Sequence, residues 1–339
     1  MLKNAIAKLV EGRSLSESES YDAVKSIMEG AATPVQIAAF LTALRMKGET
    51  VEEITGAARL MREKALRIYP KAHDVVDTCG TGGDRSGTFN ISTTTALVVA
   101  GAGVPVAKHG NRSVSSACGS ADVLEALGVK IDLKPEQVEE CLNEVGIAFL
   151  FAPVFHLSMK HAAPVRKELG IRTLFNLLGP ISNPAGAPYQ VMGVFAHEWT
   201  EPMAMVLGNL GTRRAFVVHG SDGLDEVTIT GPTRVSEWKD GAVTTSEVTP
   251  ESVGLRRGQA ADLKGGDAQV NARIVREVLS GEKGPRHDIV LMNAGLALVA
   301  AGRADFLADG VRLAAKSIDS NKALEKLDAL VQFTNAARG

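Results

Sequence analysis

Apolar side chains recur at helical spacing through the N-terminal part of the chain. Leu2, Ile6, Leu9 and Val10 fall on one face of a first helix. Capping-box pairs then mark further helix starts at Ser16/Glu19, Thr33/Gln36 and Thr50/Glu53. The helix from Pro34 is rich in alanine, which favours close packing against another helix of this chain or of a second subunit. The pattern therefore predicts an all-helical N-terminal region.

From residue 74 onward, short Val-rich runs alternate with helical stretches. Candidate strands are residues 74–77, 104–107, 147–151, 189–194 and 215–219. Candidate helices between them are residues 92–100, 120–127, 135–145 and 202–210. This alternation is typical of a mostly parallel sheet covered by helices. Ligands of such sheets bind beyond the carboxyl ends of the strands.

Residues 156–188 interrupt this alternation with helical stretches at 161–169 and 173–178, the second ended by Gly179-Pro180. We expect this segment to rejoin the helical region. The predicted organisation is an α/β fold with a small helical domain, residues 1–72 joined by about 156–188. A larger α/β domain comprises 73–155 and 189–339, with a hinge and a cleft between the two. Short polar strands with a turn at Asp240-Gly241 precede the last helices, including 288–301 and 321–336.

Polar loops follow two of the predicted strands. The glycine-rich loop 80–84 offers bare backbone N–H groups, which can converge on phosphate oxygens. Residues 108–113 offer cationic and amide side chains. Because both loops leave carboxyl ends of strands, we expect them to line one pocket for a small, heavily charged anion, with a phosphorylated sugar as the best candidate. A glycine-rich turn alone is weak evidence, and neither a P-loop nor a dinucleotide fingerprint is present.

Several further side chains have both a structural and a functional interpretation. The hydroxyl run from Ser92 either caps a helix or faces a phosphate. His109 either holds a substrate or bonds a backbone carbonyl. Asp225 and Glu226 either form an exposed acidic loop or hold a divalent ion that is bound to phosphates. Arg166 either lies on a solvated helix face or grips a carboxylate with its guanidinium fork.

Composition excludes some classes of protein. With 45% hydrophobic and 22% charged residues and a net charge of -2, the chain lacks the basic excess of a nucleic-acid-binding protein. No long uncharged apolar segment suggests a membrane span, and the start lacks signal-peptide features. Cys79, Cys118 and Cys141 fit neither a disulfide framework nor a zinc site, so we expect a reduced, cytoplasmic setting.

Taken together, these segments resemble the anthranilate phosphoribosyltransferase family, of the nucleoside phosphorylase/phosphoribosyltransferase fold. The resemblance covers essentially the whole chain. It is carried by residues 77–84, by 108–116 with 119–122, by 172–180 with 183–184, and by the pair 225–226.

The resemblance implies an Mg²⁺-dependent glycosyltransferase of tryptophan biosynthesis. Such an enzyme transfers the phosphoribosyl group of 5-phosphoribosyl 1-diphosphate to the amine of anthranilate and releases diphosphate. The family also implies a homodimer joined through the helical domain. No catalytic residue is assigned, and His109 is the candidate. The implied donor contacts are Gly80, Gly83, Asp84, Thr88, Asn90, Ile91, Ser92, Thr93, Lys108, His109, Gly110, Asn111, Arg112, Ser113, Val114, Ser115, Ser116 and Ser120. The implied anthranilate contacts are Gly80, Asn111 and Arg166, and the implied metal ligands are Ser92, Asp225 and Glu226.

Two other functions are compatible with this fold. A pyrimidine nucleoside phosphorylase would use phosphate to cleave a ribosyl bond, but the Lys-His-Gly-Asn-Arg run at 108–112 is not expected in that family. A non-catalytic relative that binds nucleic acid should present a basic groove. The balance of 37 Lys and Arg against 39 Asp and Glu argues against that relative.

Overall fold

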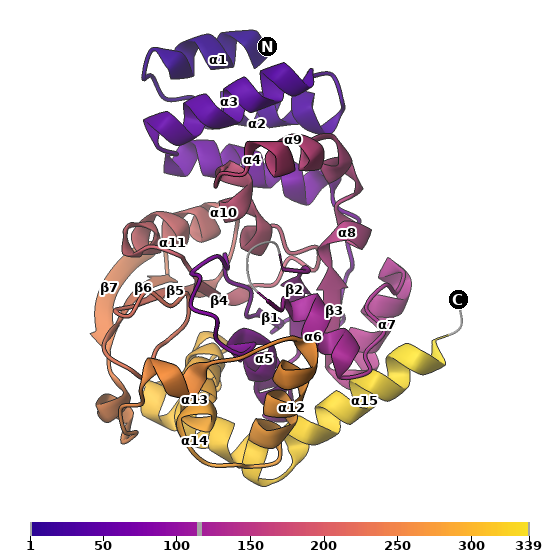
Figure 1. The fold of residues 1–339 in the computed structure, drawn as a ribbon, viewed down its shortest axis with the longest axis vertical. Helices are drawn as coiled ribbons and strands as arrows, with labels where there is room; N and C mark the ends of the chain where they lie inside the picture. The colour runs from indigo at the N-terminus through magenta and orange to yellow at the C-terminus, as the bar shows by residue number, and fades with distance from the viewer. Residues whose placement is uncertain (1, 114–116, 338–339) are drawn as a thin grey trace.

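The computed structural model describes residues 2–113 and 117–337 of the chain. A narrow helical part stands above a broader part built on a sheet (Figure 1). The helical part begins with α1 Leu2–Val10, α2 Glu17–Met28, α3 Pro34–Lys47 and α4 Val51–Lys64. The three predicted capping boxes are confirmed at the starts of α2, α3 and α4. In α3, Ile37, Leu41 and Leu44 are buried, whereas Ala38 is only half-buried.

The broader part contains a seven-stranded sheet of order β3-β2-β1-β4-β5-β6-β7. The strands are β1 Val76–Asp77, β2 Val106–Gly110, β3 Ile147–Phe151, β4 Tyr189–Gly193, β5 Arg214–Gly220, β6 Thr233–Lys239 and β7 Ala242–Val248. Strands β1 to β5 pair in parallel, and β6 and β7 add an antiparallel edge. The predicted fold class, a helical domain with a mostly parallel α/β domain, is confirmed.

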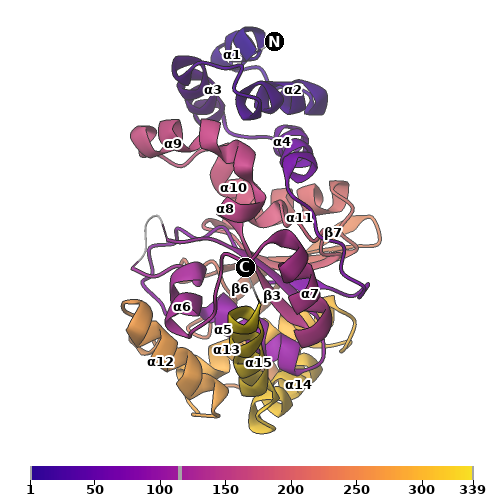
Figure 2. The same ribbon diagram turned by 90° about the vertical axis from the view of Figure 1, so that its right-hand side faces the viewer.

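Helices cover both faces of this sheet (Figure 2). The helices of this part are α5 Ile91–Gly101, α6 Ser120–Ala126, α7 Pro135–Val145, α8 Ala152–Phe155, α11 Thr200–Asn209, α12 Ala268–Leu279, α13 Pro285–Ala300, α14 Leu307–Asp319 and α15 Lys322–Ala336. Helices α5, α7, α11, α13 and α15 contact strands, whereas α12 and α14 pack on other helices. Successive residues of β5 alternate between two cores: Phe216 joins the core that contains α5 and α13, and Val217 joins the core that contains α11 and the N-terminal helices. The helical part therefore shares a core with one face of the sheet.

The segment that interrupts the alternation lies with the N-terminal helices (Figure 1). It contains a 3₁₀ turn over Leu157–His161, α9 Ala163–Leu169 and α10 Leu174–Ile181. Helix α9 contacts α3, and α10 contacts both α3 and α4. The exact domain boundaries and the hinge stay predictions.

Several predicted element boundaries differ from the structure by one to three residues, and two of the differences lie at the site. The strand expected at residues 104–107 is β2, Val106–Gly110, so Lys108 and His109 belong to the strand and not to the loop. Pairing with β3 extends it, in register from Val106 opposite Ile147 to Gly110 opposite Phe151. The helix expected to end at Gly179 continues through Pro180 to Ile181. Proline is tolerated there because the last turn of a short helix loses only one backbone hydrogen bond.

The predicted turn at Asp240-Gly241 is confirmed. Both residues have positive φ, 51° and 86°, and they join β6 to β7. A two-residue hairpin loop needs this left-handed geometry because its twist matches that of the flanking strands. In the part of the chain that the structure describes, no helix is long and apolar enough to cross a membrane.

Candidate active site

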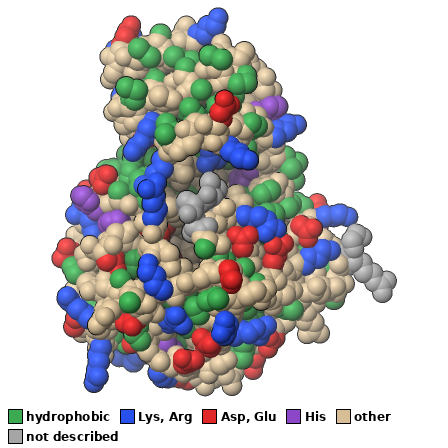
Figure 3. Space-filling model, in the orientation of Figure 1, with side chains coloured by type: hydrophobic (Ala, Val, Ile, Leu, Met, Phe, Trp, Pro, Cys, Tyr) green, Lys and Arg blue, Asp and Glu red, His purple; other side chains and the backbone are tan. Residues whose placement is uncertain are grey.

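A cavity of about 920 Å³ opens beyond the carboxyl ends of the central strands. Figure 3 shows the surface hollowed where the narrow helical part meets the broader part, with Lys and Arg side chains around the opening. All described residues that the sequence predicts for the site line this cavity, from Gly80 to Glu226. Val114, Ser115 and Ser116 lie outside the described residues. The substrate and metal roles of all these residues stay predictions, but the structure brings the described ones to one place.

The glycine-rich loop follows β1 and packs directly on the strand beside it. Thr81 donates its backbone N–H to the Gly193 carbonyl at 2.8 Å, and Gly82 donates to the Asp225 carboxylate at 2.6 Å. A side chain cannot be placed at Gly193, since its Cβ would lie 1.5 Å from the Asp225 carbonyl oxygen. Close backbone packing therefore fixes where the loop meets Asp225.

Asp77, at the end of β1, supports the glycine-rich loop from within the fold. Its buried carboxylate accepts hydrogen bonds from the backbone N–H groups of Cys79 and His109 and from the Asn183 amide, the last at 2.7 Å. Burial raises the pKa of Asp77 to about 6, against the opposing effect of Lys108. This carboxylate ties together the loop, β2 and the segment that follows α10.

Lys108 projects from β2 toward the start of α5. Its ammonium group donates to the Thr78 carbonyl and to the Ser92 hydroxyl, each at 3.3 Å. Only 3% of the residue is exposed, so a buried cation lies at the base of the cavity. One interpretation of the sequence makes Ser92 an N-cap, but α5 begins at Ile91, so Ser92 lies inside its first turn. Its hydroxyl accepts from Lys108 and can still donate to a polar partner in the cavity.

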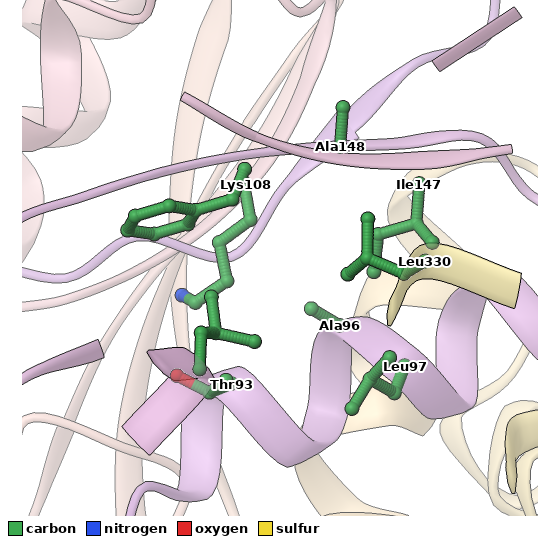
Figure 4. A pocket seen from close by; sticks show the side chains of 9 residues that line it. Thr93, Ala96, Leu97, Lys108, Ile147, Ala148 and Leu330 are labelled. Atoms are coloured by element: carbon green, nitrogen blue, oxygen red, sulfur yellow. The ribbon is translucent and has the colours of Figure 1, made fainter. Parts of the chain in front are cut away.

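Behind Lys108 lies a second, very small cavity of about 10 Å³. Figure 4 shows Lys108 passing from the strand toward Thr93, with Ala96, Ile147 and Leu330 on the far side. Such a volume holds at most one water molecule. The aliphatic stem of Lys108 thus closes the floor of the large cavity.

Asp225 and Glu226 form an acidic pair in the cavity wall, beside the glycine-rich loop and the start of α5. Both are half-buried. Burial and the nearby Asp84 raise the pKa of Asp225 to about 7, and burial together with Asp225 raises the pKa of Glu226 well above its usual value. Two adjacent desolvated carboxylates fit a divalent cation, which would relieve their repulsion.

The described residues hold no cluster of three or more His, Cys, Asp or Glu suited to a metal ion. Magnesium fits this setting because it needs few protein ligands when phosphate and water supply the rest.

His109 and His156 form a buried pair on the other side of the cavity. His109 Nδ1 lies 3.0 Å from the Gly179 carbonyl, and the two Nε2 atoms are 3.2 Å apart. Burial lowers the pKa of His109 to about 3 and that of His156 to about 4. In a neutral pair, His109 donates from Nδ1 to Gly179 and accepts from His156 at Nε2. Sequence reasoning missed His156, which no motif marks.

Arg166 faces the cavity from α9. Its guanidinium lies 5.2 Å from the centre of the Phe175 ring. In residues 2–113 and 117–337, no carboxylate pairs with this guanidinium. A half-buried cation without an acidic partner at a cavity wall suits an anionic ligand. Phe175 was also missed by sequence reasoning, because its apolar character reads as core.

Two predicted contact residues have side chains engaged by the protein itself. Arg112 lines the cavity, but its guanidinium forms ion pairs with Asp122 and Glu125 on α6. The Asn90 amide donates to the Cys118 carbonyl and accepts from Asn271 at 2.9 Å. These side chains shape the wall, so any direct contact with a ligand would come from their remaining polar atoms.

The architecture and the site together define a class. A helical bundle joined to an α/β sheet carries, between the two parts, a cavity suited to a phosphorylated ligand and a metal. Residues 3–65 match the glycosyl transferase family, helical bundle domain. Residues 72–324 match the glycosyl transferase family, a/b domain. The chain is therefore a member of this glycosyl transferase family.

Individual relatives narrow the class. The chain is 62% identical to an anthranilate phosphoribosyltransferase of Moorella thermoacetica, over 99% of both chains. A crystal structure of the Thermus thermophilus anthranilate phosphoribosyltransferase matches with a TM-score of 0.93 and 47% identity, over 98% of this chain and 99% of that one. The Saccharomyces cerevisiae enzyme in complex with PRPP and Mg matches with a TM-score of 0.90 and 29% identity, over 99% of this chain and 98% of that one. The chain thus belongs to the anthranilate phosphoribosyltransferases.

Proposed function

We propose that this protein transfers the phosphoribosyl group of 5-phosphoribosyl 1-diphosphate to the amine of anthranilate. The products are N-(5-phosphoribosyl)anthranilate and diphosphate, and the reaction is a step of tryptophan biosynthesis. The observation that carries the proposal is the cavity with two chemically different ends. One end offers loop N–H groups, Lys108 and the acidic pair, and the other offers Arg166 beside an aromatic ring.

The donor end supports departure of diphosphate. Breaking the bond at the anomeric carbon builds negative charge on the leaving group, which N–H donors and a cation stabilise. Ser92, Asp225 and Glu226 are the residues that would hold magnesium. When bound, the ion would neutralise charge on the diphosphate oxygens. Lys108 adds a fixed positive charge at the base of the cavity.

The acceptor end supports positioning more than proton transfer. An aromatic amine is neutral at pH 7 and can attack without prior deprotonation. His109 and His156 have lowered pKa values and hydrogen-bond each other, so a histidine cation at neutral pH is not expected here. We assign Arg166 to the carboxylate of anthranilate, which would aim the amine at the sugar. We assign no general base.

The direct test follows the fluorescence of anthranilate with the donor, with and without Mg²⁺. Loss of signal that requires both donor and metal would support the proposed transfer. Without such loss, phosphate-dependent release of thymine or uracil from a nucleoside would indicate the phosphorylase. Salt-sensitive binding to single-stranded DNA would instead indicate the non-catalytic relative.

The assembly and the setting of the enzyme are also proposals. We propose a homodimer through the helical part, in the cytoplasm, with the domain division at residues 1–72 and 156–188. Exposed apolar side chains support the dimer: Val10 on α1 and Val35 and Met46 on α3 are 73%, 78% and 83% exposed. Sedimentation equilibrium would test it, and a monomer at micromolar concentration would refute it.

A further inference from the structure

Two cationic side chains outside the cavity hold residues 83–87, which are the end of the glycine-rich loop and the residues that continue it. Arg172, between α9 and α10, donates from Nη2 to the Gly83 carbonyl. Lys264 donates to the Ser86 carbonyl at 2.6 Å. Both carbonyls belong to residues that line the cavity, whereas neither cation is among the described residues that line it. The two cations therefore hold the loop backbone without lining the cavity.

Hydrogen bonds within the loop leave two peptide orientations open. The Ser86 N–H donates to the Asp84 carboxylate, but among the described residues no group of the loop itself donates to the Gly83 or Ser86 carbonyl. Gly82, Gly83, Arg85 and Gly87 all have positive φ, between 60° and 81°. Glycine has nearly equal access to both signs of φ, so a peptide plane in such a segment can turn over at low cost. A hydrogen bond from a side chain outside the loop to the carbonyl of such a peptide then favours one orientation of the peptide plane. Hydrogen bonds from charged donors are strong enough to do this.

Because the peptides are trans, a hydrogen bond that fixes the direction of a carbonyl also fixes the direction of the next residue's N–H. The described chain has no cis peptide, so the C=O of one residue and the N–H of the next point in opposite directions. With the Gly83 carbonyl directed at Arg172, the Asp84 N–H points away from Arg172. With the Ser86 carbonyl directed at Lys264, the Gly87 N–H points away from Lys264. Asp84 and Gly87 both line the cavity, and among the described residues neither N–H has a hydrogen-bond partner in the protein.

Arg172 is itself held in place. Its guanidinium carbon lies 4.1 Å from the centre of the Phe195 ring, just after β4. Its charge interacts with the like charges of Arg85 and Arg45 and with the carboxylates of Asp225 and Asp84. A cation here offsets the repulsion that these carboxylates would exert on an incoming diphosphate. The side chain links the segment between α9 and α10 to the loop across the cavity's edge.

We propose that Arg172 and Lys264 are positioning residues that turn the N–H groups of Asp84 and Gly87 toward the diphosphate of the donor. This inference rests on the proposed transferase function and deepens it. The two side chains act through the loop backbone, without touching the substrate. They should therefore affect recognition of diphosphate and leave recognition of anthranilate unchanged.

The test compares Arg172→Gln, Arg172→Lys, Lys264→Met and the double variant Arg172→Gln/Lys264→Met in the full chain. Arg257→Gln is the matched control, because Arg257 pairs with Glu251 on the surface and lies outside the site. We expect the donor KM to rise about tenfold in Arg172→Gln, the loss of roughly one charged hydrogen bond. Lys264→Met should give a smaller rise because Lys264 is exposed, and Arg172→Lys should recover part of the parent value.

Diphosphate serves as the second probe. Its inhibition constant should rise in parallel with the donor KM, while the anthranilate KM changes by less than about twofold. Equal rises in both KM values, or unchanged diphosphate inhibition in variants with the parent Tm, would overturn the inference and leave the transferase function intact. If the parent protein has no transferase activity, the proposed function fails. Calorimetric binding of diphosphate with Mg²⁺ to the parent and Arg172→Gln would then decide the positioning role separately, since equal affinities would refute it.

Discussion

The two ends of the cavity are built in different ways. The proposed donor end is built around backbone, a glycine-rich loop with positive φ angles packed so closely that Gly193 has no space for a Cβ beside Asp225. Lys108, Asp225 and Glu226 add charged side chains to it. The proposed acceptor end is made of side chains from separate elements: His109 on β2, His156 after α8, Arg166 on α9 and Phe175 on α10. A backbone site can bind phosphate groups through N–H donors, whereas a side-chain site can distinguish the shape and charge of an aromatic acid.

We expect the largest loss of activity when the two carboxylates of the proposed donor end, Asp225 and Glu226, are removed. In Asp225→Ala/Glu226→Ala we expect kcat/KM at fixed Mg²⁺ to fall by about 10³-fold or more, because the charge on the leaving group would lose its bound cation. The measurement is a magnesium titration of the initial rate at several donor concentrations. The variant should need more metal or fail to saturate.

A matched control is Asp319→Ala, because Asp319 on α14 forms an exposed pair with Lys283 and does not line the cavity. It should titrate with magnesium as the parent does. An unchanged magnesium titration in the double variant would mean that Asp225 and Glu226 form an acidic loop with no metal role.

The same contrast explains which features the sequence could predict. Capping boxes, the glycine-rich loop and the Asp240-Gly241 turn rest on local chemistry, and each was predicted at the right position. The extension of β2 through His109 depends on pairing with β3, a contact between distant segments, and was missed. Proline at position 180 predicted a helix end, but one lost hydrogen bond in a last turn is a small cost.

The acceptor end was harder to predict for the same reason. Arg166 is a candidate from the chemistry of its guanidinium and from the resemblance, but His156 and Phe175 carry no local signal of a site. The ion pairs that hold Arg112 come from α6, ten and more residues away. Side-chain sites assembled from several elements become visible only once the fold brings those elements together.

A smaller effect should follow from the acceptor end. In Arg166→Ala, the anthranilate KM should rise about 30-fold, since a charged hydrogen bond to a carboxylate contributes roughly 2 kcal/mol. The donor KM should change little. Steady-state kinetics with each substrate varied in turn would measure both constants.

Arg166→Lys separates charge from shape, because a lysine keeps the cation but lacks the bidentate fork. Its anthranilate KM should fall between the parent and alanine values. A comparable rise of both KM values in Arg166→Ala would show that this arginine stabilises the whole cavity and does not recognise the acceptor.

The smallest effect concerns stability and pH. His109 and His156 have pKa values near 3 and 4 in the folded protein, below the ordinary 6.5, so the unfolded chain binds more protons between those values. The free energy of unfolding is therefore highest, as far as this pair contributes, above pH 6.5. It falls as the pH drops toward 4 because the unfolded chain takes up protons that the folded protein does not. At pH 5 the loss is about 2 kcal/mol for each histidine.

His156→Gln removes one of these contributions while keeping a side chain that can donate to His109. The unfolding free energy should consequently fall less between pH 7 and pH 5 than in the parent, by about 2 kcal/mol. Urea unfolding at closely spaced pH values measures this difference directly, and His197→Gln, at an exposed position, provides the control.

The variant must be compared with the parent at each pH because Asp77 has the opposite effect on stability. The raised pKa of Asp77 makes the folded state bind more protons than the unfolded state between about pH 4 and 6. Parallel pH curves for the parent and His156→Gln would mean that the acceptor end accommodates a charged histidine pair, and positioning by a neutral pair would then be ruled out.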